Sequence, residues 1–496
     1  MTQTAIIILT IAVYLVFMAV MGITSRKSVK TLSDFTVGGG NASAWLSALS
    51  YGTAYFSAVM FIGYSGTSGW KYGGWAVLVG IGNAIFGSLL AWLVLAKRTR
   101  KIARSFEIKT MPQFFNARYN SNSMKLFSSI VIFIFLIPYS ASVYKGLTSV
   151  CSVLLGVDET ITMIIIALAS MAILLLGGYL AAIKADFVQG IIMFFGIILL
   201  IVFVMRAPTI TENGGLNGLA KLTKELNLGS KDWVALISTI LMTSFGTWGL
   251  PQMIHKYYGI KDDKEVKRGT IISTIFALLV AGGGYFIGSF GRMFYSSLDE
   301  VTNKSTDFIV PNILKNANMP SILLGIVLVL LISASVSTLS SITMTASTTA
   351  VMDIFKTCGC CEKRTTKNIR SLCVLFVIFS YLVANTNTPI LDMMSYSWGI
   401  LSGSFLAPYM LSLYLKFINK KGAFASMIVG FIVAFIPAGS MLISQVLPNV
   451  EIFATLKTYG PQFAVGAMIL SFIVCILVSK LTKKEDYTKF YKKAEI

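Results

Sequence analysis

A run of hydroxyl side chains interrupts an apolar stretch at residues 331–341, Leu-Ile-Ser-Ala-Ser-Val-Ser-Thr-Leu-Ser-Ser. Serines recur there at three- and four-residue spacing, which on a helix lines one face with oxygen. Hydrocarbon offers hydroxyls no partner, so they must face protein, water or a bound cation, and several oxygens together suit a hard cation such as sodium. Small residues that pack closely and bond back to their own helix are the alternative. The residues are Ser333, Ser337, Ser340 and Ser341, with Thr338 beside them.

Two further segments are built to break a helix in mid-membrane. Residues 48–57 (Ala-Leu-Ser-Tyr-Gly-Thr-Ala-Tyr-Phe-Ser) are followed by glycines at 63, 66 and 69, and residues 244–251 read Ser-Phe-Gly-Thr-Trp-Gly-Leu-Pro. Glycine and proline leave backbone polar groups without helical partners. Such groups are tolerated at membrane depth only where they face a cavity or a ligand. Glycines that merely let helices pack closely are the alternative.

Two ionisable residues within or near apolar segments need a reason to be there. Asp186 follows Gly177-Gly178 and could attract a cation leaving inward, or pair with Lys184. Lys145 lies six residues beyond Tyr139 and could reach the outer interface with its ammonium or meet a substrate carboxylate.

The elements that must position these residues are membrane-spanning helices. The 496 residues are 55% hydrophobic and 12% charged, with a mean hydropathy of +0.76, and little sequence remains for a soluble catalytic domain. The sequence predicts an all-α polytopic membrane protein with about thirteen spans. These lie near 5–25, 42–69, 74–96, 126–154, 160–181, 187–206, 232–255, 269–291, 308–352, 371–386, 389–415, 422–446 and 462–479.

The two breakable segments open spans two and seven, which are five elements apart. Because five is odd, the second set of five helices is inverted relative to the first, which is the layout of LeuT-type transporters. We therefore expect a first helix and loop at 1–41, repeats at 42–206 and 207–415, and two additional helices with a tail at 416–496.

The net charge of +20 reflects membrane topology and not nucleic-acid binding. With the N-terminus outside and the C-terminus in the cytoplasm, 30 of the 41 Lys and Arg residues fall in cytoplasmic segments, as the positive-inside rule requires. The cysteines predict no disulfide framework, and the cluster Cys358, Cys360 and Cys361 is best explained as incidental loop thiols.

Five segments in order resemble the sodium/solute symporter family, most closely its sodium/proline-carrier branch, over nearly the whole chain. Residues 34–40 (Asp-Phe-Thr-Val-Gly-Gly-Gly) with 48–50 resemble the entry into the first broken helix, and 177–189 the family signature without its usual Trp-Thr before the Asp. Residues 248–251 resemble the second broken helix, 337–340 the sodium-binding helix, and 395–398 the gating helix.

The resemblance implies a sodium site between the first broken helix and the hydroxyl helix. Ser337 and Thr338 would supply side-chain oxygens, and Asp186 would lie on the ion's inward path. Backbone carbonyls would come from Thr53, Phe56 and Ala334.

The resemblance also implies a solute site, and there the chain departs from the proline carrier. Tyr55 stands where that carrier has a functional Asp, and Thr243 and Thr247 stand where it offers Trp and Tyr. These departures make proline doubtful as the solute. The expected solute residues are Tyr55, Tyr139, Thr243, Thr247, Trp248 and Pro251, with Lys145 as a candidate charge and Tyr396 and Trp398 as the gate.

The sequence thus predicts an inner-membrane symporter that imports a small organic solute, an amino acid or a carboxylate, with sodium as the coupling ion. Apart from the solute, sodium and the lipid bilayer, no partner is expected, and neither HExxH nor a Cys/His pair indicates an enzyme. A proton-coupled or cation-independent carrier on the same fold, and a membrane solute sensor, are the alternatives.

Overall fold

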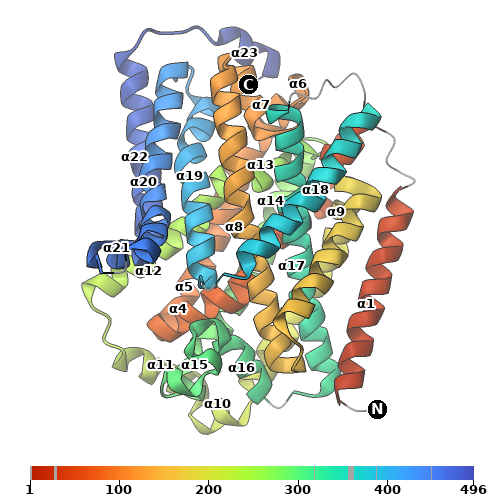
Figure 1. Ribbon diagram of the computed structural model, residues 1–496, viewed down its shortest axis with the longest axis vertical. Helices are drawn as coiled ribbons and strands as arrows, with labels where there is room; N and C mark the ends of the chain where they lie inside the picture. Colours follow the sequence, from red (N-terminus) through yellow and green to blue (C-terminus); the bar gives the residue numbers. More distant parts are fainter. Residues whose placement is uncertain are drawn as a thin grey trace.

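The computed structural model describes residues 3–26, 31–317, 319–355, 362–386, 388–447 and 449–495. These residues form helices together with one isolated parallel bridge between Ala42 and Ile260. The two ends of the chain lie at opposite ends of the long axis (Figure 1). The Cys358, Cys360 and Cys361 cluster lies outside the described residues.

The first part of the chain supplies α1 at one edge of the molecule, the first broken helix, and two long helices. Short 3₁₀ and π segments carry η labels. The elements are α1 (Gln3–Arg26), α2 (Leu32–Val37), η1 (Gly38–Gly40), α3 (Ala44–Tyr55), η2 (Val59–Tyr64), α4 (Ser65–Tyr72), η3 (Gly73–Ala76), α5 (Val77–Gly82), η4 (Asn83–Leu90), η5 (Trp92–Ala96), α6 (Lys97–Ser105), α7 (Met111–Tyr119), α8 (Asn122–Leu155) and α9 (Glu159–Met205).

The second part contains the other broken helix and the hydroxyl-rich helix α17. Its elements are α10 (Pro208–Glu212), α11 (Gly215–Glu225), α12 (Ser230–Phe245), η6 (Gly246–Gly249), α13 (Pro251–Tyr258), α14 (Asp263–Ser289), α15 (Gly291–Phe294), η7 (Leu298–Glu300), η8 (Thr302–Lys304), η9 (Thr306–Phe308), α16 (Ile309–Asn316), α17 (Ser321–Thr349), η10 (Ala350–Ile354), α18 (Glu362–Ala384) and α19 (Ile390–Tyr414).

The last part forms the edge opposite α1, where α20 and α22 pack against α19 (Figure 1). Its elements are α20 (Lys420–Val446), α21 (Glu451–Leu456), η11 (Lys457–Tyr459), α22 (Gly460–Leu481) and α23 (Thr488–Ala494).

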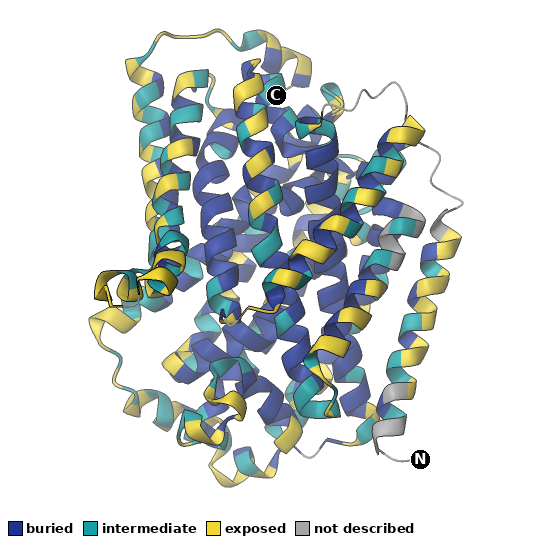
Figure 2. Ribbon diagram, viewed as in Figure 1, coloured by how far each residue is buried: buried dark blue, intermediate teal, exposed yellow. Residues whose placement is uncertain are grey.

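Burial separates a central layer from an apolar outer surface. In α17, 89% of the most apolar 18-residue window is buried, against 33% in α20 and in the segment containing α22. The outward faces of α1, α20 and α22 are exposed in Figure 2, and they carry large apolar side chains such as Val16, Ile432 and Ile473. Exposed apolar side chains at this density suit contact with lipid hydrocarbon. The hydroxyls of α17, in contrast, are turned toward protein.

Both predicted helix breaks are present. α3 ends at Tyr55, and Phe56 takes extended dihedrals (φ −104°, ψ 97°) before the chain becomes helical again. η6 and α13 are separated by Leu250 (φ −80°, ψ 120°), and the helices on either side are bent by 49°. Pro251 is the first residue of α13, where its missing N–H costs no helical hydrogen bond.

The predicted spans 160–181 and 187–206 form one helix, α9, with a non-helical residue inside it at Gly178. Among the described residues eight segments are long and apolar enough to cross a membrane, and the bent pair makes a ninth. Other predicted spans correspond to helices that are too short or not apolar enough to be counted among these segments. One is α19, whose serines and tyrosines lower its hydropathy while the helix itself is almost entirely buried.

Candidate functional site

The break in the first broken helix places free carbonyls against α17. The last carbonyls of α3 have no helical N–H partner because the chain leaves the helix at Phe56. The Thr338 hydroxyl on α17 donates to the Thr53 carbonyl at 3.1 Å, and it lies 3.0 Å from the Ala334 carbonyl one turn back. The Thr338 hydroxyl and the carbonyls of Thr53 and Ala334 therefore bring three oxygens from two helices together.

Ser337 extends this oxygen cluster toward α9. Its hydroxyl lies 2.8 Å from the Thr53 hydroxyl and 2.6 Å from Asp186 Oδ1. Ser337, Thr53 and Asp186 are all buried. The structure thus brings together the residues that the resemblance assigned to a sodium site, with Phe56 at the break itself, and adds Asp186 to the same network.

Asp186 pairs with a lysine that the sequence did not single out. Its Oδ2 accepts from Lys256 Nζ at 3.1 Å, and both side chains are 1% exposed. The expected alternative partner, Lys184, is not the one to which the carboxylate bonds. Lys256 also donates to the hydroxyls of Ser50 and Ser341, at 2.8 Å each.

Aromatic side chains gather beside the break. The Tyr55 ring stacks on Phe56 with centroids 4.1 Å apart and lies 6.1 Å from the Trp398 ring. Tyr139 on α8 meets the same indole edge-on at 5.5 Å. The Tyr139 hydroxyl and Trp398 Nε1 are both buried, and the two side chains are hydrogen-bonded to each other, with the indole N–H donating and the phenol oxygen accepting. The Tyr139 O–H has no acceptor within the described ranges, so one hydrogen-bond donor is left for a ligand that accepts.

The two threonines of the second broken helix are already engaged. The Thr243 hydroxyl donates to Thr239 O and lies 2.8 Å from Asn83 Oδ1, while its own carbonyl accepts from the Tyr55 hydroxyl at 2.7 Å. The Thr247 hydroxyl donates to Ser244 O at 2.8 Å. The two threonines thus belong to a network that ties the broken helices to η4.

Two other expected residues lie apart from the aromatic cluster. Trp248 donates from Nε1 to Phe86 O at 2.9 Å and lines an apolar hollow of about 260 Å³ between α12, α19 and α22. The Tyr396 hydroxyl donates to Lys457 O at 3.0 Å, in η11. Of the expected gate pair, only Trp398 touches Tyr55 and Tyr139.

Lys145 is held near the start of α19. Its ammonium donates to the backbone carbonyls of Thr386 and Thr388, the latter at 2.9 Å. This contact satisfies the charge with carbonyl dipoles and fixes the loop between α18 and α19. The interfacial position expected for Lys145 fits this arrangement better than a role at the solute site.

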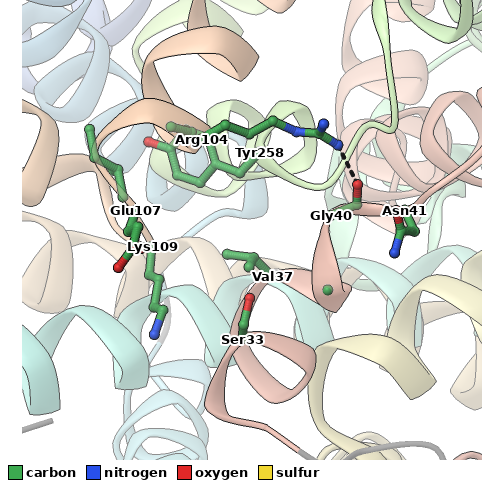
Figure 3. A pocket seen from close by; sticks show the side chains of 11 residues that line it. Ser33, Val37, Gly40, Asn41, Arg104, Glu107, Lys109 and Tyr258 are labelled. Carbon is green, nitrogen blue, oxygen red and sulfur yellow. Dashed lines mark hydrogen bonds between the residues drawn. The ribbon is translucent and has the colours of Figure 1, made fainter. Parts of the chain in front are cut away.

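A closed latch lies at the end of the molecule that carries the C-terminus. Arg104 on α6 donates to the carbonyls of Gly40 and Ile260, the second at 3.0 Å, and thus joins the loop before α3 to the loop after α13. Ala42 exchanges two backbone hydrogen bonds with residues 259–261, at 2.9 and 3.0 Å. Beside the latch is a hollow of about 480 Å³, shown in Figure 3, which is lined by Ser33, Val37, Gly39, Gly40, Asn41, Ala103, Arg104, Glu107, Ile108, Lys109 and Tyr258.

Sequence reasoning placed Lys256 in a basic cytoplasmic segment and gave Asn83 and Ser50 no role. A signal for Lys256 was available, because it follows Pro251 by only five residues and so lies on the second half of the broken helix. A lysine at that depth needs a carboxylate, and Asp186 is a candidate within the same bundle. Ser50 and Asn83 gave no comparable signal, since single polar residues in a helix are common packing residues.

Comparison with known proteins agrees with this architecture. A profile of the sodium:solute symporter family matches residues 35–430. The chain is 27% identical over 491 residues to the osmoregulated proline transporter OpuE of Bacillus subtilis, covering 96% of this chain and 95% of that one. It is 26% identical over 487 residues to a sodium/proline symporter of Staphylococcus aureus, covering 96% and 92%.

Solved structures share the fold. A Na+-coupled sialic acid symporter superposes with a TM-score of 0.75 at 19% identity over 97% of this chain and 98% of that one. Mhp1, a nucleobase-cation-symport-1 family transporter, gives 0.54 at 13% identity over 92% and 98%. Both are LeuT-fold transporters, which confirms the predicted fold class.

The broken helices, the oxygen cluster between the first of them and α17, and a family profile that covers most of the chain point the same way. The chain is a transporter and not an enzyme, and sodium is a transported ion and not a resident cofactor. It belongs to the sodium:solute symporter family and is a sodium-coupled solute symporter.

Proposed function

We propose that this symporter imports a small amino acid or carboxylate, with its N-terminus outside the cell membrane and its C-terminus in the cytoplasm. The distribution of Lys and Arg supports this orientation. The proline transporters among its relatives support an amino acid as the solute class.

The observation that carries the solute class is the Tyr139 hydroxyl, a buried donor beside Trp398 that has no acceptor in the described part of the chain. A buried donor without a partner is costly, so such groups in a transporter's central cluster suit a ligand that supplies the acceptor. A carboxylate accepts through two oxygens, and hydrogen bonds to an ionised acceptor are roughly twice as strong as neutral ones. The apolar body of the solute would lie against Tyr55 and Phe56.

The ligands proposed for sodium are the Thr338 and Ser337 hydroxyls with the carbonyls of Thr53, Phe56 and Ala334. An ion there would replace the hydrogen bonds that now link α3 to α17. Sodium would thereby hold the first broken helix in the position in which Tyr55 faces Trp398. A ligand that binds one conformation more tightly shifts the population toward it, so sodium would favour the solute-competent state.

Alternating access would follow from rearrangement around this fixed site. The closed latch at Arg104 supports a conformation sealed at the end that carries the C-terminus. One sodium ion moving down a 100 mV potential supplies about 2.3 kcal/mol, before its concentration gradient is counted. Opening the latch would release sodium past Asp186 together with the solute.

We propose that the solute carries a carboxylate, and we do not propose that it is proline. Tyr55 stacks on Phe56 and bonds to the Thr243 carbonyl, so this wall of the site is aromatic and lacks an acidic side chain. A cationic group of the solute would have to find its partner elsewhere, for example in the free carbonyls of the helix break.

The test is uptake into proteoliposomes that contain the purified protein. Radiolabelled amino acids and monocarboxylates are compared under an inward sodium gradient and under potassium alone, and solutes without a carboxylate serve as controls. We expect sodium-dependent accumulation of at least one carboxylate-bearing solute. Accumulation confined to solutes without a carboxylate would overturn the proposed solute class.

A further inference from the structure

Three oxygen atoms form a cage around the Lys256 ammonium. Its Nζ lies 2.8 Å from Ser50 Oγ, 2.8 Å from Ser341 Oγ and 3.1 Å from Asp186 Oδ2. These oxygens come from three elements, α3, α17 and α9, while the lysine itself belongs to α13. The face of the Tyr179 ring lies 5.1 Å from the ammonium, within the range of a cation–π contact.

A carboxylate and two hydroxyls converging on one point are also the ligand types of a hard monovalent or divalent cation. A buried carboxylate requires a compensating charge, and here a side chain of the same protein provides it. Because the ammonium is attached to the chain, it occupies the cage without being taken up from solution.

This cage lies one helical turn from the proposed sodium ligands on both helices that hold them. Ser50 precedes Thr53 by three residues on α3, and Ser341 follows Ser337 by four on α17. Asp186 joins the two sites, since Oδ2 accepts from Lys256 and Oδ1 lies 2.6 Å from the Ser337 hydroxyl. The two cation positions are therefore neighbours that share one carboxylate.

We propose that Lys256 is a built-in cation that fills a second cation site beside the sodium site. This inference rests on the proposed function for the position of the sodium ligands. The protein then couples uptake to one sodium ion, and removal of the ammonium converts the cage into a site for a second free monovalent cation. Asp186 is a positioning residue that orients Ser337 from one oxygen and holds the fixed charge with the other.

The experiment is equilibrium binding of radioactive sodium to the purified full-length protein in detergent. We expect about one ion per chain for the parent, about two for Lys256→Ala, and no more than one for the double variant Asp186→Asn/Lys256→Ala, in which the cage has lost its charge and Ser337 has lost the partner that orients it. Lys145→Ala is the matched control, because within the described ranges that ammonium donates to two loop carbonyls and not to the cage, and it should bind like the parent. Equal sodium counts for the parent and Lys256→Ala would overturn the proposal.

Because Lys256→Ala leaves a buried carboxylate uncompensated, its stability is measured as well. Thermal unfolding is followed in sodium, methylammonium and choline chloride. We expect sodium and methylammonium to raise the melting temperature of Lys256→Ala by several degrees over choline, and to leave that of the double variant at its choline value or raised only as in the parent. A Lys256→Ala protein that no small cation stabilises beyond the parent's response, or that fails to fold in all three salts, counts against the proposal.

The outcomes also separate this inference from the proposed function. A parent that binds no sodium would refute the proposed sodium site, while a gain of one ion in Lys256→Ala would still support the cage. A parent that binds two ions would leave the sodium site standing and refute the built-in cation.

Discussion

Ser337 and Thr338 are neighbours in sequence, yet their hydroxyls face different partners. Thr338 reaches the carbonyls at the end of α3, whereas Ser337 bridges the Thr53 hydroxyl and the Asp186 carboxylate. Successive residues on a helix point about 100° apart, so the pair can serve two sides of one ion. Each hydroxyl therefore contributes separately, and their removal has distinguishable effects.

Replacement of Thr338 by Ala should raise the sodium concentration that gives half-maximal uptake by about fivefold, because one oxygen ligand worth roughly 1 kcal/mol is lost. Thr338→Ser keeps the hydroxyl and should behave nearly as the parent. The measurement is solute uptake in proteoliposomes as a function of sodium. An unchanged sodium requirement in Thr338→Ala would remove this residue from the site.

Tyr139→Phe should weaken solute binding by about tenfold or more and leave the sodium requirement unchanged, since a hydrogen bond to a charged acceptor contributes about 1.5–3 kcal/mol. Tyr144→Phe is the matched control, because that hydroxyl lies on the same helix and hydrogen-bonds to Ser170 on α9. Affinities from thermal-shift titrations with the transported solute decide the question. Equal losses in the two variants would point to a general effect on α8.

At the scale of elements, the most constrained position is the kink in α9. Gly178 has φ +56° and ψ −150°, and a Cβ there would lie 2.4 Å from a ring carbon of Phe35. The kink lets α2 pack against α9 two turns before Asp186, so it helps to set where the carboxylate meets α17. The conformation is open only to glycine, which explains this part of the family-like segment at 177–189.

Gly178→Ala should destabilise the protein by about 2 kcal/mol or more, since both the dihedrals and the contact with Phe35 become strained. Gly282→Ala on α14 is the control, because nothing lies within 4 Å of its added Cβ. Unfolding in detergent, followed by thermal or denaturant titration, gives the comparison. A Gly178→Ala protein as stable as Gly282→Ala would show that α9 relaxes around the new methyl group.

Helix breaks and hydroxyl spacing were readable from sequence because glycine, proline and serine act locally on the backbone. The pairing of Asp186 with Lys256 was not, since the two residues are separated by 70 positions and meet only once the helices are packed together. The hydrogen bonds made by Thr243 and Thr247 could not be read from the sequence for a related reason. A threonine on a helix can bond to its own preceding turn, and spacing alone does not say whether it does.

At the scale of the whole molecule, the arrangement is closed at one end by contacts between its two halves. Arg104 links the loop before α3 to the loop after α13 through backbone carbonyls. Each broken helix is thereby tethered at the same end. Transport requires these tethers to release, so the strength of the latch sets how often that end opens.

Arg104→Gln should increase opening at this end. In a background without other cysteines, alkylation of a cysteine placed at Ser33 should become about threefold to tenfold faster, which corresponds to roughly 0.7–1.4 kcal/mol of lost closure. Lys109→Gln is the control, because its side chain lines the same hollow without joining the two loops (Figure 3). If alkylation rates are equal in the two variants, Arg104 does not hold the latch closed.

The parallel bridge at Ala42 has a consequence for observing the protein at work. The amide hydrogens of Ala42 and Lys261 are held by carbonyls of the opposite loop, so neither can exchange with deuterium while the two loops stay paired. Their hydrogen-exchange rates therefore report how readily the two loops separate. Sodium and solute, added singly and together, would each change these rates, and mass spectrometry of the peptides containing these residues would record the change in the unmodified protein.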